Sequence, residues 1–348
     1  MPADVAHILA DGAVIPAHPL ALTTQRRLDE RHQRALTRYY LAAGAGGLAV
    51  GVHTTQFEIR EPAHNLLRPV LELAAEVMDA EAQRPIIRVA GACGDTPQAV
   101  AEAELAASLG YHAVLLSPAV PGASHEHLLT RATAVGEVLP IIGFYLQEAI
   151  GGPQLPVAFW RAFADLPSVV AVKTAPFNRY RTIDVVRAVA ESDRGAEIAL
   201  YTGNDDAIVA DLLSEFRFRS GDREVVRHIN GGLLGQWAVW TRRAVEMLDQ
   251  AKAARAGDLA TLALLTARAT AVTDANAAVF DAANGFAGSI PGVHEVLRRQ
   301  GLITGTWCLS PDEVLSPGQA EELTRVTETH PWLTDDEFVA AHLDHWLA

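Results

Sequence analysis

The sequence predicts an α/β protein built as a (β/α)8 barrel, in which eight parallel strands are surrounded by helices. Two observations lead to this fold class. Short apolar runs alternate with longer amphipathic segments, which is the order of elements in a parallel sheet covered by helices. Eight such units fit within residues 1–235, and a barrel of this kind takes roughly 250 residues. A doubly wound open sheet is the alternative arrangement of the same units.

We expect the strands where apolar runs are short and bounded by turn residues, because strands of a parallel sheet are buried on both faces. In chain order these runs are 13–22, 47–52, 85–93, 112–119, 140–147, 168–175, 197–204 and 225–232. Helices are expected between them. In the segment 96–110, for example, Thr96 is suited to cap a helix, Pro97 to its first position and Gly110 to its end.

The character of the chain changes after the eighth apolar run. Beyond residue 233 the pattern is helical only. We therefore expect a barrel over residues 1–235, whose last helix runs to about residue 256, followed by a carboxyl-terminal helical appendage over residues 257–348.

The composition is that of a globular protein with a large core, since 49% of the residues are hydrophobic and 20% are charged. The formal net charge of −14 argues against nucleic acid and anionic membrane surfaces as partners, because both would repel it. Cys93 and Cys308 are the two cysteines, too few for a disulfide framework. The amino-terminal segment has the pattern of neither a signal peptide nor a membrane span. These features favour a small-molecule substrate and a cytoplasmic location.

A lysine in an unusual place is the first candidate functional residue. The run "SVVAVKTAP" (168–176) is apolar, as in a buried strand, but carries Lys173 at its carboxyl end. The chain has only one other lysine, Lys252, beside 26 arginines. Active sites of (β/α)8 barrels form at the carboxyl ends of the strands, so Lys173 is expected in the active site. The alternative is that its stem packs in the core and its amino group reaches solvent.

The strand before it offers a partner. Tyr145 lies in the run 140–147, and side chains alternate between the two faces of a strand. Counting along both runs places Tyr145 and Lys173 at one level and on one face, unless Tyr145 is an ordinary core aromatic. Desolvation lowers the pKa of a lysine from its usual value near ~10.4, which makes a neutral amine available to attack a carbonyl carbon. Tyr145 would then exchange protons with the resulting carbinolamine.

Metal and organic cofactors are not expected. The two histidine pairs, in "SHEH" (124–127) and "HLDHW" (342–346), are not four residues apart on a helix and have no third ligand nearby in the sequence. Both are expected on the solvated surface.

Several segments resemble, in order, those of the dihydrodipicolinate synthase and N-acetylneuraminate lyase family: "GLAVGVHTT", "LPIIGFYLQEAIGG", "LPSVVAVKTA" and "LYTGNDD". The resemblance is good over roughly residues 13–210. Members of that family are (β/α)8 barrels that form a lysine Schiff base with pyruvate or a related 2-oxo acid. The 28 residues between Tyr145 and Lys173 resemble the family's spacing between its tyrosine and its Schiff-base lysine.

The resemblance also implies substrate-binding residues. The family carries two small hydroxyl residues after the second strand, which hold the carboxylate of the 2-oxo acid. In "GVHTTQFE" this pair is either His53 and Thr54 or Thr54 and Thr55, so Thr54 is expected in the site in both cases. His53 is either a member of the proton relay or a histidine hydrogen-bonded in a loop. Gly203, Asn204 and Asp205 resemble the family's Gly-Asp-Asp segment, which lies near the site.

The function expected from these residues is that of a class I aldolase-type lyase, or a dehydratase or synthase, acting on a 2-oxo acid through Lys173. Ile150 takes the place of an arginine that, in the lysine-biosynthetic synthase, engages the aldehyde's carboxylate, so that reaction is not expected. The family's interface tyrosine falls near Ala119 and Val120, but a homo-oligomer, a dimer or tetramer, is still expected. The alternatives are a non-catalytic barrel that binds a small ligand, and a phosphate- or metal-dependent barrel enzyme.

Overall fold

The computed structural model, which describes residues 1–148, 151–220 and 222–348, contains a parallel eight-stranded barrel. This arrangement confirms the predicted (β/α)8 fold, and the open sheet is excluded. The strands follow in the order β1-β10-β7-β6-β5-β4-β3-β2. Their bounds are β1 (Val14–Pro16), β2 (Gly47–Val50), β3 (Ile87–Ala92), β4 (Ala113–Leu116), β5 (Ile141–Leu146), β6 (Val169–Ala175), β7 (Ala199–Thr202) and β10 (Gly231–Leu234).

The barrel closes between its first two strands. β1 pairs in parallel with β10, and beyond the end of β1 a single bridge joins Ala17 to Ala49 of β2. The His18 N–H donates to the Ala49 carbonyl oxygen at 2.8 Å and completes this contact. The eight strands thus surround one interior, filled by alternate side chains such as Ile15, Val89 and Leu115.

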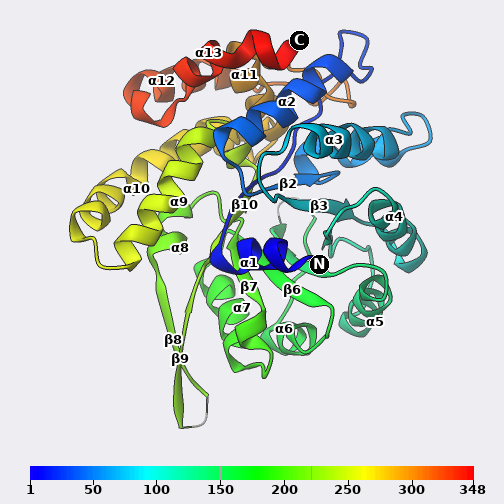
Figure 1. Cartoon of the computed structure of the whole chain (residues 1–348), viewed down its shortest axis with the longest axis vertical. Helices are drawn as coiled ribbons and strands as arrows, with labels where there is room; N and C mark the ends of the chain where they lie inside the picture. The colour runs from blue at the N-terminus through cyan, green and yellow to red at the C-terminus, as the bar shows by residue number, and fades with distance from the viewer. Residues whose placement is uncertain (149–150, 221) are drawn as a thin grey trace.

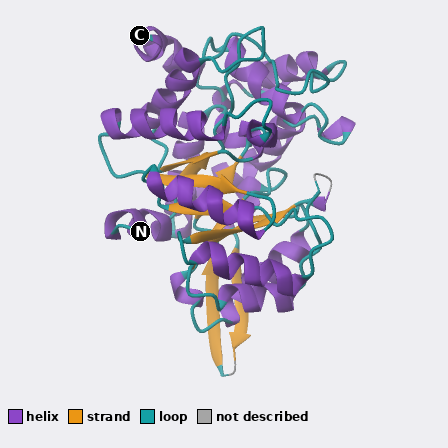
Figure 2. Ribbon diagram, turned by 90° about the vertical axis from the view of Figure 1, so that its right-hand side faces the viewer, coloured by secondary structure: helices purple, strands orange, loops and turns teal. Residues whose placement is uncertain are grey.

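Helices cover the outside of the strands, as Figures 1 and 2 show. Asp95, one residue before the expected Thr96, caps α4, because its side chain accepts the Thr96 N–H at 2.7 Å. Pro97 is in the first turn, where its missing N–H costs no hydrogen bond. The outer helices are α2 (Glu30–Ala43), α3 (Leu67–Glu81), α4 (Thr96–Ser108), α5 (His125–Gly136), α6 (Val157–Ala164), α7 (Arg179–Glu191), α8 (Ile208–Leu213) and α9 (Thr241–Arg255).

An amino-terminal helix, α1 (Ala3–Asp11), packs against the amino end of the barrel interior. No apolar run in the sequence predicted this helix. Val5 and Leu9 pack with the interior side chains. Tyr201 of β7 accepts the Ala13 N–H at 3.1 Å and donates to the Leu9 carbonyl oxygen at 2.9 Å. These contacts cover the amino end of the barrel.

The eighth barrel strand lies later than the sequence predicted. The expected run 225–232 contains two different elements: its start belongs to β9 (Arg223–His228), whereas Gly231 begins β10. β9 pairs antiparallel with β8 (Glu215–Ser220) in a hairpin that projects from the barrel in Figure 1. The prediction was wrong because "EVVRH" is as rich in β-formers as "INGGLL", and composition does not separate a surface strand from a barrel strand.

Four further helices follow the barrel: α10 (Leu259–Val279), α11 (Ser289–Arg299), α12 (Gln319–Thr329) and α13 (Asp336–Leu347). Of these, α13 packs against α2, whereas α10 packs against α8 and α9 (Figure 1). The Tyr39 hydroxyl of α2 donates to Asp335, the residue before α13, at 2.8 Å. Among the helices of the described ranges, none is both long and apolar enough to cross a bilayer. The boundary at residue 257 stays a prediction.

Candidate active site

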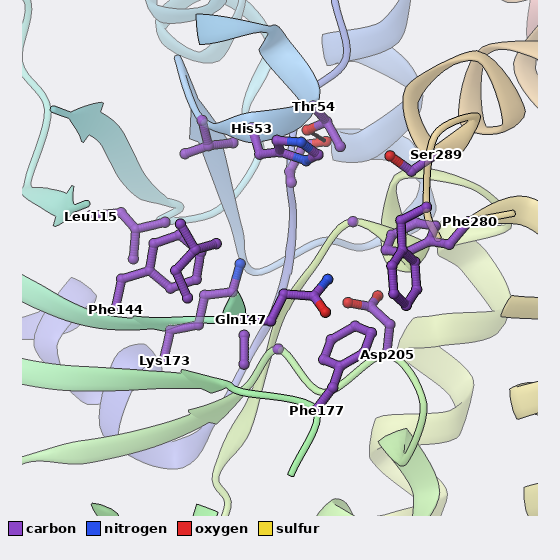
Figure 3. Close-up of a pocket in the computed structure, with 17 residues that line it drawn as sticks. His53, Thr54, Leu115, Phe144, Gln147, Lys173, Phe177, Asp205, Phe280 and Ser289 are labelled. Atoms are coloured by element: carbon purple, nitrogen blue, oxygen red, sulfur yellow. Dashed lines mark hydrogen bonds between the residues drawn. The ribbon is translucent and has the colours of Figure 1, made fainter. Parts of the chain in front are cut away.

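A pocket of about 610 Å³, including its open mouth, lies at the carboxyl ends of the strands (Figure 3). Barrels of this kind have their active sites at this end. Most of the wall is apolar, formed by side chains such as Leu115, Phe144 and Leu146. Six polar or charged side chains line it: His53, Thr54, Gln147, Lys173, Asp205 and Ser289.

Lys173 enters this pocket from β6, as the sequence predicted. Its side chain is 9% exposed, and Nζ lies 4.3 Å from the centroid of the Phe144 ring. Within the described part of the chain, Nζ makes neither a hydrogen bond nor an ion pair. Lys252 differs, because its Nζ binds the Asp11 carboxylate at 2.6 Å and the Gly12 carbonyl oxygen at 2.8 Å. Lys173 is therefore the lysine whose amino group is available to a ligand.

Gly203 makes room for the stem of Lys173. A Cβ atom on Gly203 would lie 2.4 Å from Lys173 Cε and 2.8 Å from the Cβ of Ala175. Both distances are too short for carbon atoms that are not bonded to each other. Gly203 also lines the pocket, so the structure places this predicted site residue next to the lysine.

Lys173 and Asp205 change each other's ionisation. Burial lowers the pKa of Lys173 to about 8, against an upward effect of the Asp205 charge. Burial raises the pKa of Asp205 to about 7, against the hydrogen bond from the Gln236 N–H and the charge of Lys173. With a pKa near 8, about one lysine in ten is neutral at pH 7, compared with one in a few thousand for an exposed lysine. The site therefore holds a nucleophile and an acid–base group that both titrate near neutral pH.

His53 lies in the pocket wall, in the short helix η1 (His53–Thr55) that follows β2. Burial, followed by the charge of Lys173, lowers the pKa of His53 to about 4. Its imidazole is therefore neutral at pH 7 and carries one N–H donor. Neither ring nitrogen bonds to another described residue, so this donor is available to a ligand.

Tyr145 does not share the face of Lys173, and the alignment predicted for these two residues is wrong. β5 and β6 start in the expected register, with Ile141 opposite Val169, but the next pair is Ile142 and Ala171. This one-residue irregularity places Phe144, and not Tyr145, beside Lys173. A shift of one residue exchanges the two faces of a strand.

Tyr145 instead points into the helix layer. It is 2% exposed, its ring lies 5.3 Å from that of Trp160 on α6, and its hydroxyl accepts the Leu155 N–H at 3.4 Å. These contacts are those of the core aromatic that was the alternative interpretation. We therefore do not assign Tyr145 the role of proton donor in the pocket.

The hydroxyls of the two threonines after β2 donate hydrogen bonds to the backbone just beyond the end of β1. Thr54 lines the pocket, but its hydroxyl donates to the Ala17 carbonyl oxygen at 2.8 Å. The hydroxyl of Thr55 donates to the His18 carbonyl oxygen at 2.7 Å and accepts the Gly51 N–H at 3.0 Å. Thr55 is fully buried and lies outside the pocket lining, and its contact with substrate stays a prediction. Its hydrogen-bonding groups are used to hold the turn.

Asn204 also has a supporting position. Its side chain accepts the Phe177 N–H at 3.0 Å and donates to Thr182 at 3.0 Å and Asp211 at 2.9 Å. Asn204 is 2% exposed and is not part of the pocket lining, and its contact with substrate stays a prediction. It fixes Phe177, which does line the pocket. Ile150, the remaining predicted residue, lies outside the described residues.

Several pocket residues had no role predicted from the sequence. Asp205 was expected near the site as the last residue of the Gly-Asn-Asp segment after β7, but no acid–base role was predicted for it. Gln147 is a polar residue at the end of the apolar run of β5, which is a weaker indication of a place in the site. Phe280, Phe286 and Ser289 come from the region expected to be an appendage and have no motif around them. The carboxyl-terminal region is thus part of the pocket wall.

Across residues 1–148, 151–220 and 222–348, histidine, cysteine and acidic side chains form no cluster of three or more suited to a metal ion. The donors in the pocket are a lysine, an imidazole and a carboxyl group that faces a cation, a set suited to covalent and proton-transfer chemistry.

Comparison with known proteins places these features in a family. A sequence model of the dihydrodipicolinate synthetase family matches residues 11–329. N-acetylneuraminate lyase of Citrobacter koseri is 27% identical over 205 residues, which make up 58% of this chain and 65% of that protein. The matched region thus spans less than two thirds of the length of this curated relative.

Solved structures agree in fold. CdNal of Clostridium difficile, determined in complex with mannosamine, superposes with a TM-score of 0.73 and 13% identity, covering 91% of this chain and 98% of the other. Dihydrodipicolinate synthase of Aquifex aeolicus gives a TM-score of 0.73 with 18% identity, covering 93% and 99%. At these identities the likeness shows the barrel together with its carboxyl-terminal helices.

Proposed function

The chain belongs to the dihydrodipicolinate synthetase family, and from this premise we propose that it is a Schiff-base-forming lyase of the class I aldolase type. Its substrate would be pyruvate or a related 2-oxo acid, or an aldol adduct of one. Lys173 is the nucleophile, and Asp205 is the group that exchanges protons with the reacting atoms.

One observation carries this proposal. Lys173 is a buried lysine at the carboxyl end of a barrel strand, and its amino group has no partner among the described residues. Burial lowers its pKa to about 8. Its stem is seated over Gly203, where any larger residue would displace it. A structural lysine would instead be paired, as Lys252 is with Asp11.

The chemistry begins with attack of neutral Nζ on the carbonyl carbon of the 2-oxo acid. A carbinolamine forms, and loss of water gives an iminium ion, which withdraws electrons from the adjacent carbon. In the cleavage direction the C3–C4 bond of a 4-hydroxy-2-oxo acid breaks. Its electron pair moves to the enamine, and the proton of the C4 hydroxyl passes to Asp205. Protonation at C3 and hydrolysis then release pyruvate and the lysine.

Asp205 suits the proton transfers better than His53 does. A general acid–base works best when its pKa lies near the working pH, and the pKa of Asp205 is about 7 whereas that of His53 is about 4. Asp205 is oriented by the Gln236 N–H, which donates to its Oδ1 at 2.9 Å. The second oxygen remains for the substrate.

His53 and Thr54 lie where the carboxylate of the 2-oxo acid would be bound. The neutral imidazole of His53 presents an N–H donor. Thr54 would have to exchange its hydrogen bond with Ala17 for one with the substrate, so we assign the main contact to His53. Assembly into a dimer or tetramer and a cytoplasmic location stay predictions.

The test is reductive trapping of pyruvate. Protein mixed with pyruvate and borohydride should gain one pyruvate-derived group per chain by intact mass, and peptide mapping should place it on Lys173. Lys173→Ala should lose the adduct, and Lys173→Arg should not restore it, because guanidinium stays protonated. Lys252→Ala is the matched control, as it removes the other lysine and should keep the adduct.

An adduct confined to Lys252 would contradict the proposal. So would the absence of any adduct with a panel of 2-oxo acids. Saturable binding of a 2-oxo acid without an adduct would instead support a non-catalytic barrel that binds a small ligand.

A further inference from the structure

Two phenylalanines in unusual backbone conformations meet at the pocket. Phe177 has φ +48° and Phe286 has φ +71°, and both line the pocket. Bulky residues rarely adopt positive φ, because the side chain then crowds the backbone. Their rings are in edge-to-face contact, with centroids 5.7 Å apart and planes at 84°. Such strain is found at binding and catalytic sites when the surrounding structure enforces it.

Buried polar groups hold the Phe286 loop in this conformation. The Phe286 N–H donates to the Asp281 carbonyl oxygen at 3.0 Å. The Asp281 carboxylate accepts the Gly288 N–H at 3.0 Å and the Asn284 amide at 2.6 Å. Gln319 of α12 donates to the Gly288 carbonyl oxygen at 2.9 Å. Together with the hydrogen bond from the Phe177 N–H to Asn204, these contacts hold the backbone of both phenylalanines, whose rings then meet edge to face.

A third ring completes this wall. Phe280, at the end of α10, packs against Gly235 so closely that a Cβ there would lie 2.6 Å from Phe280 Cζ. Figure 3 shows Phe280 facing the cavity from the side opposite to Leu115 and Phe144. The three rings of Phe177, Phe280 and Phe286, here called the aromatic wall, thus bound the part of the pocket that lies away from Phe144.

The charges of the lining residues argue against a substrate with a second carboxylate in the part of the pocket next to the aromatic wall. Lys173 is the single lysine or arginine among the described residues that line the pocket, and Schiff-base formation would consume it. A second carboxylate on the substrate would be buried without a cation, which is costly. Besides His53 and Thr54, which lie where the carboxylate of the 2-oxo acid would bind, Gln147 and Ser289 are the neutral polar side chains of the described lining, too few to pair every hydroxyl of a sugar chain.

We propose that the aromatic wall binds a planar aromatic group on the aldehyde-derived end of the substrate. The inference rests on the proposed function and specifies its substrate class. The reaction is cleavage of a 4-aryl-4-hydroxy-2-oxobutanoate to pyruvate and an aromatic aldehyde, or the reverse. The C3–C4 bond breaks, its electrons pass to the enamine on Lys173, and the hydroxyl proton leaves through Asp205. Water lost when the iminium forms is regained when it hydrolyses.

The experiment compares three substrates of the same reaction by pyruvate release. They are 4-hydroxy-2-oxo-4-phenylbutanoate, 4-hydroxy-2-oxopentanoate and a polyhydroxylated 2-oxo acid. We expect kcat/KM for the phenyl compound to exceed that for the methyl compound by roughly tenfold or more, the size of one to two good aromatic contacts. Phe286→Leu should reduce this ratio by roughly threefold to tenfold. Phe218→Leu, on the hairpin far from the pocket, should leave it unchanged.

Pyruvate trapping on Lys173 separates this inference from the proposed function. Trapping with an equal or inverted preference between phenyl and methyl substrates would overturn the aromatic wall and leave the lyase intact. A preference for the polyhydroxylated acid would do the same. The wild-type comparison decides the question even if Phe286→Leu does not fold.

Discussion

Phe144 of β5 lies beside Lys173 of β6 in the barrel, with the lysine Nζ 4.3 Å from the ring centroid. The ring face stabilises the ammonium ion, by roughly 0.5–2 kcal/mol at sites of this kind. It contributes no exchangeable proton. Burial acts in the opposite direction and lowers the pKa of Lys173 to about 8. The proton transfers that the resemblance assigned to a tyrosine therefore have to pass through other groups.

The first prediction concerns Tyr145→Phe. The hydroxyl of Tyr145 accepts one long hydrogen bond from Leu155 at 3.4 Å and faces the helix layer. Removing it should change the rate of pyruvate trapping less than about twofold and the free energy of unfolding by at most ~1 kcal/mol. Trapping kinetics and urea unfolding measure the two quantities. A hundredfold slower trapping by a folded variant would return Tyr145 to the active site.

The position of Tyr145 shows which part of the active site could be predicted from the sequence. Apolar runs and their turns predicted seven strands in their places, and the position of Lys173 at a strand end followed from them. The face of Tyr145 did not follow, because it depends on the register break between Val169 and Ala171. A bulge of one residue has no distinct composition in "SVVAV", so counting residues cannot detect it.

The aromatic wall was beyond prediction for a different reason. Phe280 and Phe286 lie more than a hundred residues after Lys173, in a region whose pattern indicates only helices. Their approach to the barrel depends on the packing of α10 and α11 and on the contacts of Asp281. These contacts join residues far apart in the chain, and local sequence patterns do not report them.

The second prediction concerns pH. Imine formation uses the neutral amine, so the rate of pyruvate trapping should rise with pH and level off above about 8, the pKa of Lys173. The charge of Asp205 raises that pKa. Asp205→Asn should therefore move the midpoint of the trapping profile to lower pH. The same variant should lose roughly 10²- to 10⁴-fold in aldol cleavage, because the acid–base group is gone.

Asp206→Asn is the control for this variant. Asp206 is adjacent in the chain, but its charge acts on Asp205 and raises the pKa of that carboxyl. Removing the Asp206 charge lowers the pKa of Asp205, so Asp205 stays ionised at lower pH. Because the Asp205 charge raises the pKa of Lys173, any shift in the midpoint of the trapping profile should be to higher pH. A midpoint that rises in Asp205→Asn, or cleavage that is as fast as in the wild type, would contradict the assignment of Asp205.

The third prediction concerns Gly203→Ala. The added Cβ would lie 2.4 Å from Lys173 Cε and 2.8 Å from the Cβ of Ala175, so the lysine stem must leave its position. Displacing a reacting group by about 1 Å costs up to ~10²-fold in rate, and trapping should slow by roughly 10- to 100-fold. Gly122→Ala is the comparison, since it has open space around the Cβ. It should lose stability only, and equal trapping by both variants would show that Gly203 does not position Lys173.

The last prediction concerns the buried pair of Arg60 and Glu102, which supports the loops after β2 and β3. Arg60 Nε donates to both oxygens of Glu102 at 3.0 Å, and Nη2 donates to the carbonyl oxygens of Gly51 at 2.9 Å and Gly91 at 3.0 Å. Both side chains are less than a tenth exposed, at 9% and 8%.

Glu102→Gln should therefore leave an uncompensated guanidinium in the interior, a change that typically costs ~3–5 kcal/mol in the free energy of unfolding. Urea unfolding measures it. Glu104→Gln lies on the same helix but is exposed, and should stay within about 0.5 kcal/mol of the wild type. Because Gly51 lies two residues before His53 in the turn that Arg60 holds, Glu102→Gln should also weaken binding of the 2-oxo acid. If the free energy of unfolding of Glu102→Gln is within about 1 kcal/mol of the wild-type value, water or another group compensates the charge of Arg60. The pair of Arg60 and Glu102 then does not support the active-site turn.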